Sequence, residues 1–483
     1  MSRRGLAGLH RALAAAALIL GYAMAAPAMA QQTAPTPNTA GVDPVHIGVA
    51  SCAGNNCHGA VQPLKSSHVD QNEYLIWRQK DKHSKAFAVL REERGLRIAR
   101  NLGLPDAEHA KICLDCHADN VAQDRRGPSF QIADGVGCEA CHGGAQNWLG
   151  THVSGVNHAA DIAAGMYPTD RPVERAERCV RCHIGDDKRF ASHDIMGAGH
   201  PPLPFELATF TAIQPAHFTV DKDYVERKGR PNDIMFWAVG QAVDLRTRME
   251  KVLDPNNAPK GVNPELSLFD CQACHHGVPQ SSPDNAQAKQ AALDRLQWRK
   301  RTGIQCKERL GGTGSEVETG CPGTLRLYDA SGVMLRTIAA RVAPDAAKEL
   351  TDRLVALHRA SKEKGDYWEG VKREATALKE AANKLVPVLA KHEFNQADAK
   401  ALAQAVITQA AGGEDLDYSA AQQQTMALGS IFAAMRALNL ANEAQLKALD
   451  EALGKVYEAA ADDQTYRPEK FAQALKEVEA KLP

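Results

Sequence analysis

GVGCEACHGG, residues 135–144, holds two cysteines separated by two residues, with a histidine directly after the second cysteine. The same Cys-x-x-Cys-His pattern recurs at Cys113 to His117, at Cys179 to His183 and at Cys271 to His275. Eight of the twelve cysteines therefore belong to four identical motifs. Such regular spacing is typical of a bound group and not of scattered disulfide bridges.

The spacing of these motifs matches the covalent attachment of haem c. Two thiols at this separation reach the two vinyl groups on one porphyrin edge, and the adjacent histidine reaches the iron. Structural zinc has no use for a histidine after every second cysteine, and a redox dithiol would occur once, between a strand and a helix. We therefore predict haem attachment by Cys113, Cys116, Cys138, Cys141, Cys179, Cys182, Cys271 and Cys274, with His117, His142, His183 and His275 as axial ligands.

A fifth, wider motif precedes these four. Cys52 and Cys57 are separated by Ala-Gly-Asn-Asn, and His58 follows. The glycine and asparagines would let the extra residues bulge outward as a loop, so we expect a fifth haem c here; a Cys52–Cys57 disulfide is the alternative. Five haems would leave only Cys306 and Cys321. These two flank a glycine-rich loop and are expected to form a disulfide, worth about 3 kcal/mol in the chain-entropy view.

Each iron has a second axial position, which another histidine can fill. HDIMGAGHPPLPFEL, residues 193–207, delivers His193 and His200 from a segment without cysteine, and Pro201 and Pro202 stiffen the chain after His200. We predict that the distal ligands include His83, His193 and His200, and next His152 and His158. His46, His68, His109, His217 and His276 are weaker candidates. The alternative for all of these is an ordinary surface histidine.

Three stretches resemble one known family. W-x5-HSKAF around His83, GVGCEACHGG at 135–144, and HIGDDKRF followed by MGAGHPPLPFEL look like the multihaem cytochromes related to cytochrome c-554 of nitrifying bacteria. The resemblance covers residues 46 to about 280. It implies haems packed in stacked pairs, mostly with two histidine ligands, that pass electrons between periplasmic partners, and the family pattern also allows one five-coordinate haem. The wider first motif, the fifth site and the long C-terminal extension depart from that pattern.

The N-terminus has the form of an export signal. Arg3, Arg4 and Arg11 accompany an apolar run that ends in Ala28-Met29-Ala30, a small-x-small cleavage pattern. We expect residues 1–30 to be a cleaved signal peptide and 31–45 a flexible leader; an uncleaved membrane anchor is the alternative. The expected location is the periplasm, with no membrane span after cleavage. A net charge of −1 gives no basic surface for nucleic acid.

The expected fold is mainly α and has three parts. Residues 46–285 form a multihaem cytochrome c domain with little regular secondary structure, because porphyrins supply its apolar surface. Residues 286–335 hold a connecting helix, which ends at Gly303, and a disulfide-stapled hairpin, whose strands we place over 323–338. Leucines at helical spacing predict an antiparallel bundle of four or five helices over 336–483, on which His358 and His392 are expected to be solvated.

The expected function is electron relay through five haems, because two imidazoles on each iron leave no open coordination site. The expected partners are redox proteins of the periplasm, and we assign no catalytic residue. One alternative is a redox enzyme in which a five-coordinate haem acts on a small nitrogen or sulfur species. Another is a structural or sensory subunit that works through its helical bundle. A high-spin ferric signal would favour the enzyme, and a stable complex through residues 336–483 would favour the subunit.

Overall fold

The computed structural model describes residues 44–65, 69–260, 263–271, 306–309, 316–319, 327–361, 367–411, 417–463 and 465–482. The predicted signal peptide, residues 31–43 of the predicted leader, Cys274, His275, Cys321 and the predicted helix that ends at Gly303 lie outside these residues. The predicted disulfide therefore stays a prediction. Within the described part the chain is mostly helical, as expected, and none of its helices is long and apolar enough to cross a bilayer.

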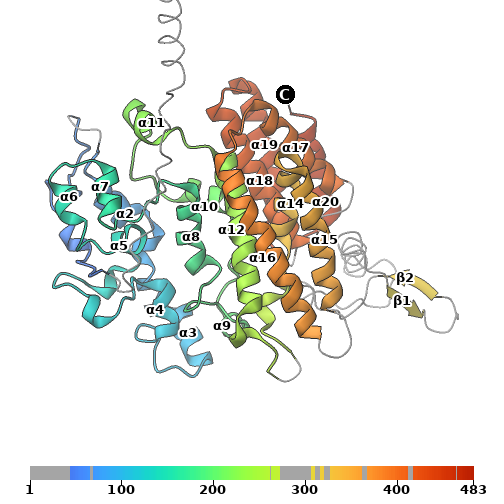
Figure 1. The fold of residues 1–483 in the computed structure, drawn as a ribbon, viewed down its shortest axis with the longest axis horizontal. Coiled ribbons are helices and arrows are strands. Elements are labelled where there is room, and N and C mark those ends of the chain that lie inside the picture. The colour runs from blue at the N-terminus through green and yellow to red at the C-terminus, as the bar shows by residue number, and fades with distance from the viewer. Residues whose placement is uncertain are drawn as a thin grey trace, which may run out of the picture.

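Short helices joined by loops make up the first part of the chain (Figure 1). They are α2 (Glu73–Lys80), α3 (Glu93–Asn101), α4 (Lys111–His117), α5 (Cys138–His142), α6 (Leu149–Val153), α7 (His158–Ala163), α8 (Pro172–His183), α9 (His193–Gly197), α10 (Leu207–Ile213) and α11 (Lys222–Lys228). Turns of 3-10 helix lie at Val49–Ser51, Lys82–Lys85, Ala88–Arg91, Gln123–Arg125, Ile132–Asp134, Pro255–Asn257 and Leu266–Leu268. The small amount of regular structure agrees with the prediction for this part.

Few apolar side chains are buried among these short helices. One cluster contains Phe87, Leu90, Ala99, Ala107, Leu114 and Ala118, and another contains Ala145, Trp148 and Met166. A segment of this length normally buries a much larger core. Part of its interior must therefore come from something other than side chains.

Long helices form the rest of the molecule. They are α12 (Asp233–Leu253), α14 (Ala330–Val342), α15 (Pro344–Ala360), α16 (Tyr367–Lys391), α17 (Gln396–Ala411), α18 (Tyr418–Ala437), α19 (Glu443–Ala459) and α20 (Pro468–Glu479). One hydrophobic cluster runs through them and continues into α8 and α10. The described part of the bundle thus has more helices than the four or five predicted.

Helix α12 lies between the short helices and the bundle (Figure 1). Asn232 caps its start by accepting hydrogen bonds from the backbone N–H groups of Ile234 and Met235. Buried positions account for 15 of its 21 residues, so α12 is covered on nearly every side. It packs against α8 and α10 on one side and against α14, α16 and α18 on the other. Although it belongs by sequence to the predicted haem domain, α12 is a central helix of the bundle core.

Two expectations for the later part of the chain are wrong. Residues 330–342 form helix α14 where a hairpin over 323–338 was predicted, because Val333, Leu335 and Ile338 are buried inside the bundle. The strands observed are β1 (Cys306–Arg309) and β2 (Glu316–Thr319), which pair antiparallel. His358 is 1% exposed and not solvated, and its Nε2 lies 3.2 Å from Asp329 Oδ2.

Candidate haem sites

Three attachment motifs end short helices. Helices α4, α5 and α8 have His117, His142 and His183 as their last residues. The two cysteines of each motif are about one helical turn apart, so both thiols and the imidazole leave the same helix end. After His142 the chain turns away through Gly143, whose φ of 78° is a conformation that glycine adopts without strain. We number the sites in chain order, so that these are the second, third and fourth.

The first site, at Cys52, Cys57 and His58, is a closed loop. The His58 N–H donates to Cys52 O at 3.1 Å, and the Gly59 N–H donates to Gly54 O at 3.0 Å. These bonds return the chain to its starting point despite the longer spacer. Both thiols are free, so the structure does not contain the alternative disulfide.

Each of the four described motif histidines faces a second histidine from elsewhere in the chain. The ring centres lie 5.9 Å apart for His58 and His152, 6.2 Å for His117 and His200, 6.2 Å for His142 and His217, and 6.3 Å for His183 and His83. Metal–nitrogen bonds of about 2.0 Å, with about 1.1 Å more to each ring centre, place two imidazoles that share one metal at about 6.2 Å. The four separations therefore match pairs of axial ligands.

Backbone carbonyls fix the tautomer of the second pair. His117 Nδ1 donates to Ala86 O and His200 Nδ1 donates to Pro201 O, both at 2.8 Å. Because a carbonyl can only accept, the proton is on Nδ1 in each ring. Nε2 keeps its lone pair, as a metal ligand requires, and the outer hydrogen bond holds the ring in place.

Carboxylates hold three other rings. His58 Nδ1 lies 2.8 Å from Glu73 Oε2, His83 Nδ1 lies 2.9 Å from Asp81 Oδ1, and His152 Nδ1 lies 3.4 Å from an Asp161 oxygen. The hydrogen bond to Glu73 raises the pKa of His58, and that to Asp81 raises the pKa of His83. A carboxylate behind an imidazole makes it a stronger donor to metal.

Burial keeps the remaining imidazoles neutral. It lowers the pKa of His142 to about 3, with a further contribution from the neighbouring His217, and it lowers the pKa of His183 to about 4. Burial also lowers the pKa of His217. A neutral ring has a lone pair for iron, whereas a protonated one does not.

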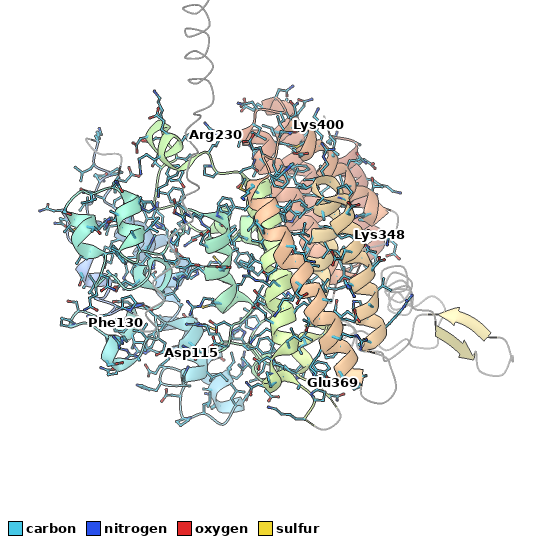
Figure 2. All side chains as sticks on the ribbon, in the orientation of Figure 1. Asp115, Phe130, Arg230, Lys348, Glu369 and Lys400 are labelled. Atoms are coloured by element: carbon cyan, nitrogen blue, oxygen red, sulfur yellow. The ribbon has the colours of Figure 1, made fainter. Side chains whose placement is uncertain are left out.

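Two thiol contacts place the sites next to one another. The thiols of Cys52 and Cys138 lie close enough to shift each other's pKa, and so do the thiols of Cys116 and Cys182. The first site is thus adjacent to the third, and the second to the fourth. Figure 2 labels Asp115, which lies in α4. The guanidinium of Arg189 donates to the carbonyl of Asp115 at 2.6 Å, which ties the second motif to the loop after the fourth.

The other predicted ligands have different surroundings. The structure places His158 Nε2 at 3.5 Å from Asp170 Oδ1 and not opposite any of the four described motif histidines. His193 begins α9, and its backbone N–H donates to Glu265. Cys271 is the last described residue of the fifth motif, so the predicted role of His193 remains untested.

His217 faces His142, although its sequence made it only one of the weaker ligand candidates. It lies in the sequence QPAHF, in a loop after α10 and two residues after Pro215. A proline close to a histidine in a segment without cysteine was the feature that singled out His200. The same feature at Pro215 could have identified His217.

The residues present fit covalently bound haem. Paired thiols accompany each of the four described motif histidines, opposed imidazoles lie at the separation that one iron requires, and the small side-chain clusters leave room for flat apolar groups. Zinc would not explain two imidazoles on opposite sides of one position, because its structural sites are tetrahedral.

Comparison with known families agrees with this geometry. Residues 51–143 match the family described as cytochrome c554 and c-prime, and residues 103–184 match cytochrome c7 and related cytochrome c. The protein is a multihaem c-type cytochrome, a class that functions in electron transfer. Over residues 51–184 it is similar to the cytochrome c554 and c7 families, which confirms the predicted resemblance. No curated protein and no solved structure matches the chain.

Proposed function

We propose that this protein is a periplasmic electron relay with five haem c groups, mostly ligated by two histidines. The observation that carries the proposal is the set of four opposed histidine pairs at ring separations of 5.9–6.3 Å. Haem supplies one-electron redox chemistry when it is bound. The chain would hold two imidazoles on each iron and leave little room for a substrate.

The hydrogen bonds behind the rings support a relay. His117, His200, His58 and His83 are each held at Nδ1 by a carbonyl or carboxylate within 3 Å. Rings fixed in this way do not need to move when an iron changes oxidation state. Electron transfer with little rearrangement is what two fixed histidine ligands favour.

The adjacent thiols suggest a route for electrons. Contacts between Cys52 and Cys138, and between Cys116 and Cys182, make two pairs of neighbouring sites. Cys141 and Cys182 also interact electrostatically, which brings the third site near the fourth. Electrons would therefore pass in the order first, third, fourth and second, with periplasmic redox proteins as partners at the exposed ends.

The experiment is expression of the full chain in a host that matures c-type cytochromes, with export to the periplasm. Mass spectrometry should give a chain that starts at Gln31 and carries five covalent haems. Ferric spectra should be low-spin, and the reduced protein should bind no carbon monoxide. A high-spin ferric signal together with carbon monoxide binding would instead assign a reactive iron, and a protein without covalent haem would end the proposal.

A further inference from the structure

Arg178 occupies a fixed position between the third and fourth sites. It precedes Cys179 in helix α8. Its guanidinium carbon lies 3.8 Å from the centre of the Tyr167 ring. The Tyr167 hydroxyl donates to Glu174 O at 2.9 Å, and the Tyr167 backbone N–H donates to His142 O at 2.8 Å. Arg178 is therefore stacked on a residue that is bonded directly to the third motif.

The guanidinium of Arg178 has no counter-ion among the described residues. Its Nε is buried and without a hydrogen-bond partner. The neighbouring arginines of α8 are satisfied, since Arg175 Nε donates to Thr169 O at 2.7 Å and Arg181 Nε lies 3.1 Å from Asp186 Oδ2. A guanidinium stays charged, so an unpaired one in a buried place is costly unless an anion joins it.

The charge of Arg178 acts on Cys179 of the fourth site as well, but its stacking on Tyr167, which is bonded to His142, points to the third site as the source of that anion. Burial raises the pKa of Cys141 to about 11 and lowers that of His142 to about 3, and the positive charge of Arg178 acts to lower both values. Asp119 acts on Arg178 electrostatically, but no carboxylate of the described residues forms an ion pair with Arg178 within 4 Å. A haem attached at this site would bring two propionate groups, and arginine binds carboxylates through two parallel N–H···O bonds.

We propose that Arg178 binds a propionate of the haem at the third site and raises the reduction potential of that haem. This inference rests on the proposed function, because it needs haem at Cys138 and Cys141. A positive charge beside the porphyrin disfavours the oxidised, more positive iron. Arg178 is thus a positioning and tuning residue that makes no contact with the iron.

The test compares three variants of the full holoprotein. Arg178→Gln removes the charge, Arg178→Lys keeps the charge without the planar fork, and Arg181→Gln removes a charge from the same helix that already has a partner. Redox titration followed by electron paramagnetic resonance separates the haems. His217→Met and His83→Met, which change the ligands at the third and fourth sites, assign the signals.

We expect Arg178→Gln to shift the reduction equilibrium of the third-site haem at least tenfold toward the oxidised form, about 59 mV for one electron. Arg178→Lys should give the third-site haem a potential between those of the wild type and Arg178→Gln. Arg181→Gln should leave the potential of the third-site haem nearly unchanged. A shift at the fourth-site haem alone would assign the propionate there and overturn the proposal. Equal shifts in the two glutamine variants would also overturn it, as would no shift.

The result is separable from the proposed function. If the wild-type protein carries covalent low-spin haems and Arg178→Gln changes no reduction potential, the proposed electron relay is supported and the proposed role of Arg178 is rejected. If Arg178→Gln does not mature, Arg178→Lys decides the question alone, because loss of the bidentate contact should lower the potential of one haem by a smaller amount. An unchanged potential in the lysine variant would then reject the proposal.

Discussion

At the scale of single residues, five of the eight paired imidazoles have one nitrogen available for iron and the other held by a hydrogen bond, and burial keeps the other three neutral. Removal of a distal ring should therefore open one coordination position that no neighbouring ring is placed to fill. His217 tests this, since it faces His142 at 6.2 Å. We expect His217→Ala to convert one haem to a high-spin form that binds carbon monoxide when reduced.

His158→Ala is the matched control for that variant, because His158 contacts Asp170. Its spectra should equal those of the wild type. Optical and paramagnetic resonance spectra measure both variants. A fully low-spin His217→Ala protein would show that another residue ligates the third iron.

Glu139 has a structural role inside the third motif. It is 3% exposed and accepts hydrogen bonds from the backbone N–H groups of Ile47, Gly48 and Ala145 at 2.7–2.8 Å. Glu139→Ala would leave these donors unpaired, so we expect a loss of about 3–5 kcal/mol in unfolding free energy. Glu177→Ala removes a carboxylate that is 40% exposed and should cost about 1 kcal/mol or less. Denaturant unfolding measures the loss of unfolding free energy in both variants. Equal losses in Glu139→Ala and Glu177→Ala would contradict the structural role of Glu139.

These residues also show what the sequence could reveal. The motif histidines were predictable because each directly follows a cysteine that is paired with a second cysteine four positions before the histidine, or six positions before it in the first motif. Their partners were predictable only by residue type, since His83 precedes His183 by a hundred residues and only the fold brings the two rings together. Nothing local separates His217, which faces His142, from His158, which faces none of the four described motif histidines. Glu139 reads in the sequence as a mere spacer between cysteines.

At the scale of elements, the close approach of α10 and α12 depends on a glycine. A Cβ at Gly240 would lie 2.6 Å from Leu207 Cβ, an atom that cannot move without its backbone. We expect Gly240→Ala to lower the unfolding free energy by about 1–3 kcal/mol through overpacking. Gly454→Ala in α19, where a Cβ meets nothing within 4 Å, should raise it by about 0.5–1 kcal/mol. Denaturant midpoints measure both, and a stabilised Gly240→Ala variant would refute the contact.

A buried carboxylate joins α10 to α18. Glu206 accepts hydrogen bonds from Ala208 N, Thr209 N and Ser430 Oγ, and burial raises its pKa from the ordinary 4.5. The folded state therefore keeps this proton to higher pH than the unfolded state does. The stability contributed by the protonated form is present below pH 4.5 and is lost as pH rises through the raised pKa.

Glu206→Gln should remove this dependence. The unfolding free energy of the variant, relative to the wild type, should increase as pH rises above 4.5 and then level off. Denaturant unfolding at a series of pH values measures the difference. A difference that is constant across the series would contradict a raised pKa.

The helix-or-strand error at α14 has a physical cause. Residues 323–338 contain short apolar runs beside a turn-like Asp-Ala-Ser-Gly, which suits a hairpin as well as a helix. Burial inside the bundle favours a helix over a hairpin here, and burial cannot be read from the sequence pattern of residues 323–338. His358 was misjudged for the same reason, because its charged neighbours in α15 gave no sign of its contact with Asp329.

At the scale of the whole molecule, α12 makes the short helices and the bundle depend on one another. The hydrophobic cluster that includes Ala176 and Val180 of α8 extends without a break to Val478 of α20. Two independent domains would each have a core of their own. Here the fold of the haem half includes a helix whose other faces are covered by α14, α16 and α18.

We therefore expect the holoprotein to unfold in a single transition. Far-ultraviolet circular dichroism reports mainly the bundle, and haem absorbance reports the short helices, so the two denaturant curves should coincide. Loss of the bundle would expose the apolar faces of α12, and α8 and α10 would lose the surface on which they pack. Two separated transitions, with haem absorbance unchanged while helical signal falls, would show that the shared core does not couple the halves. Gly240→Ala gives a second check, because a substitution at the α10–α12 contact should move both curves together.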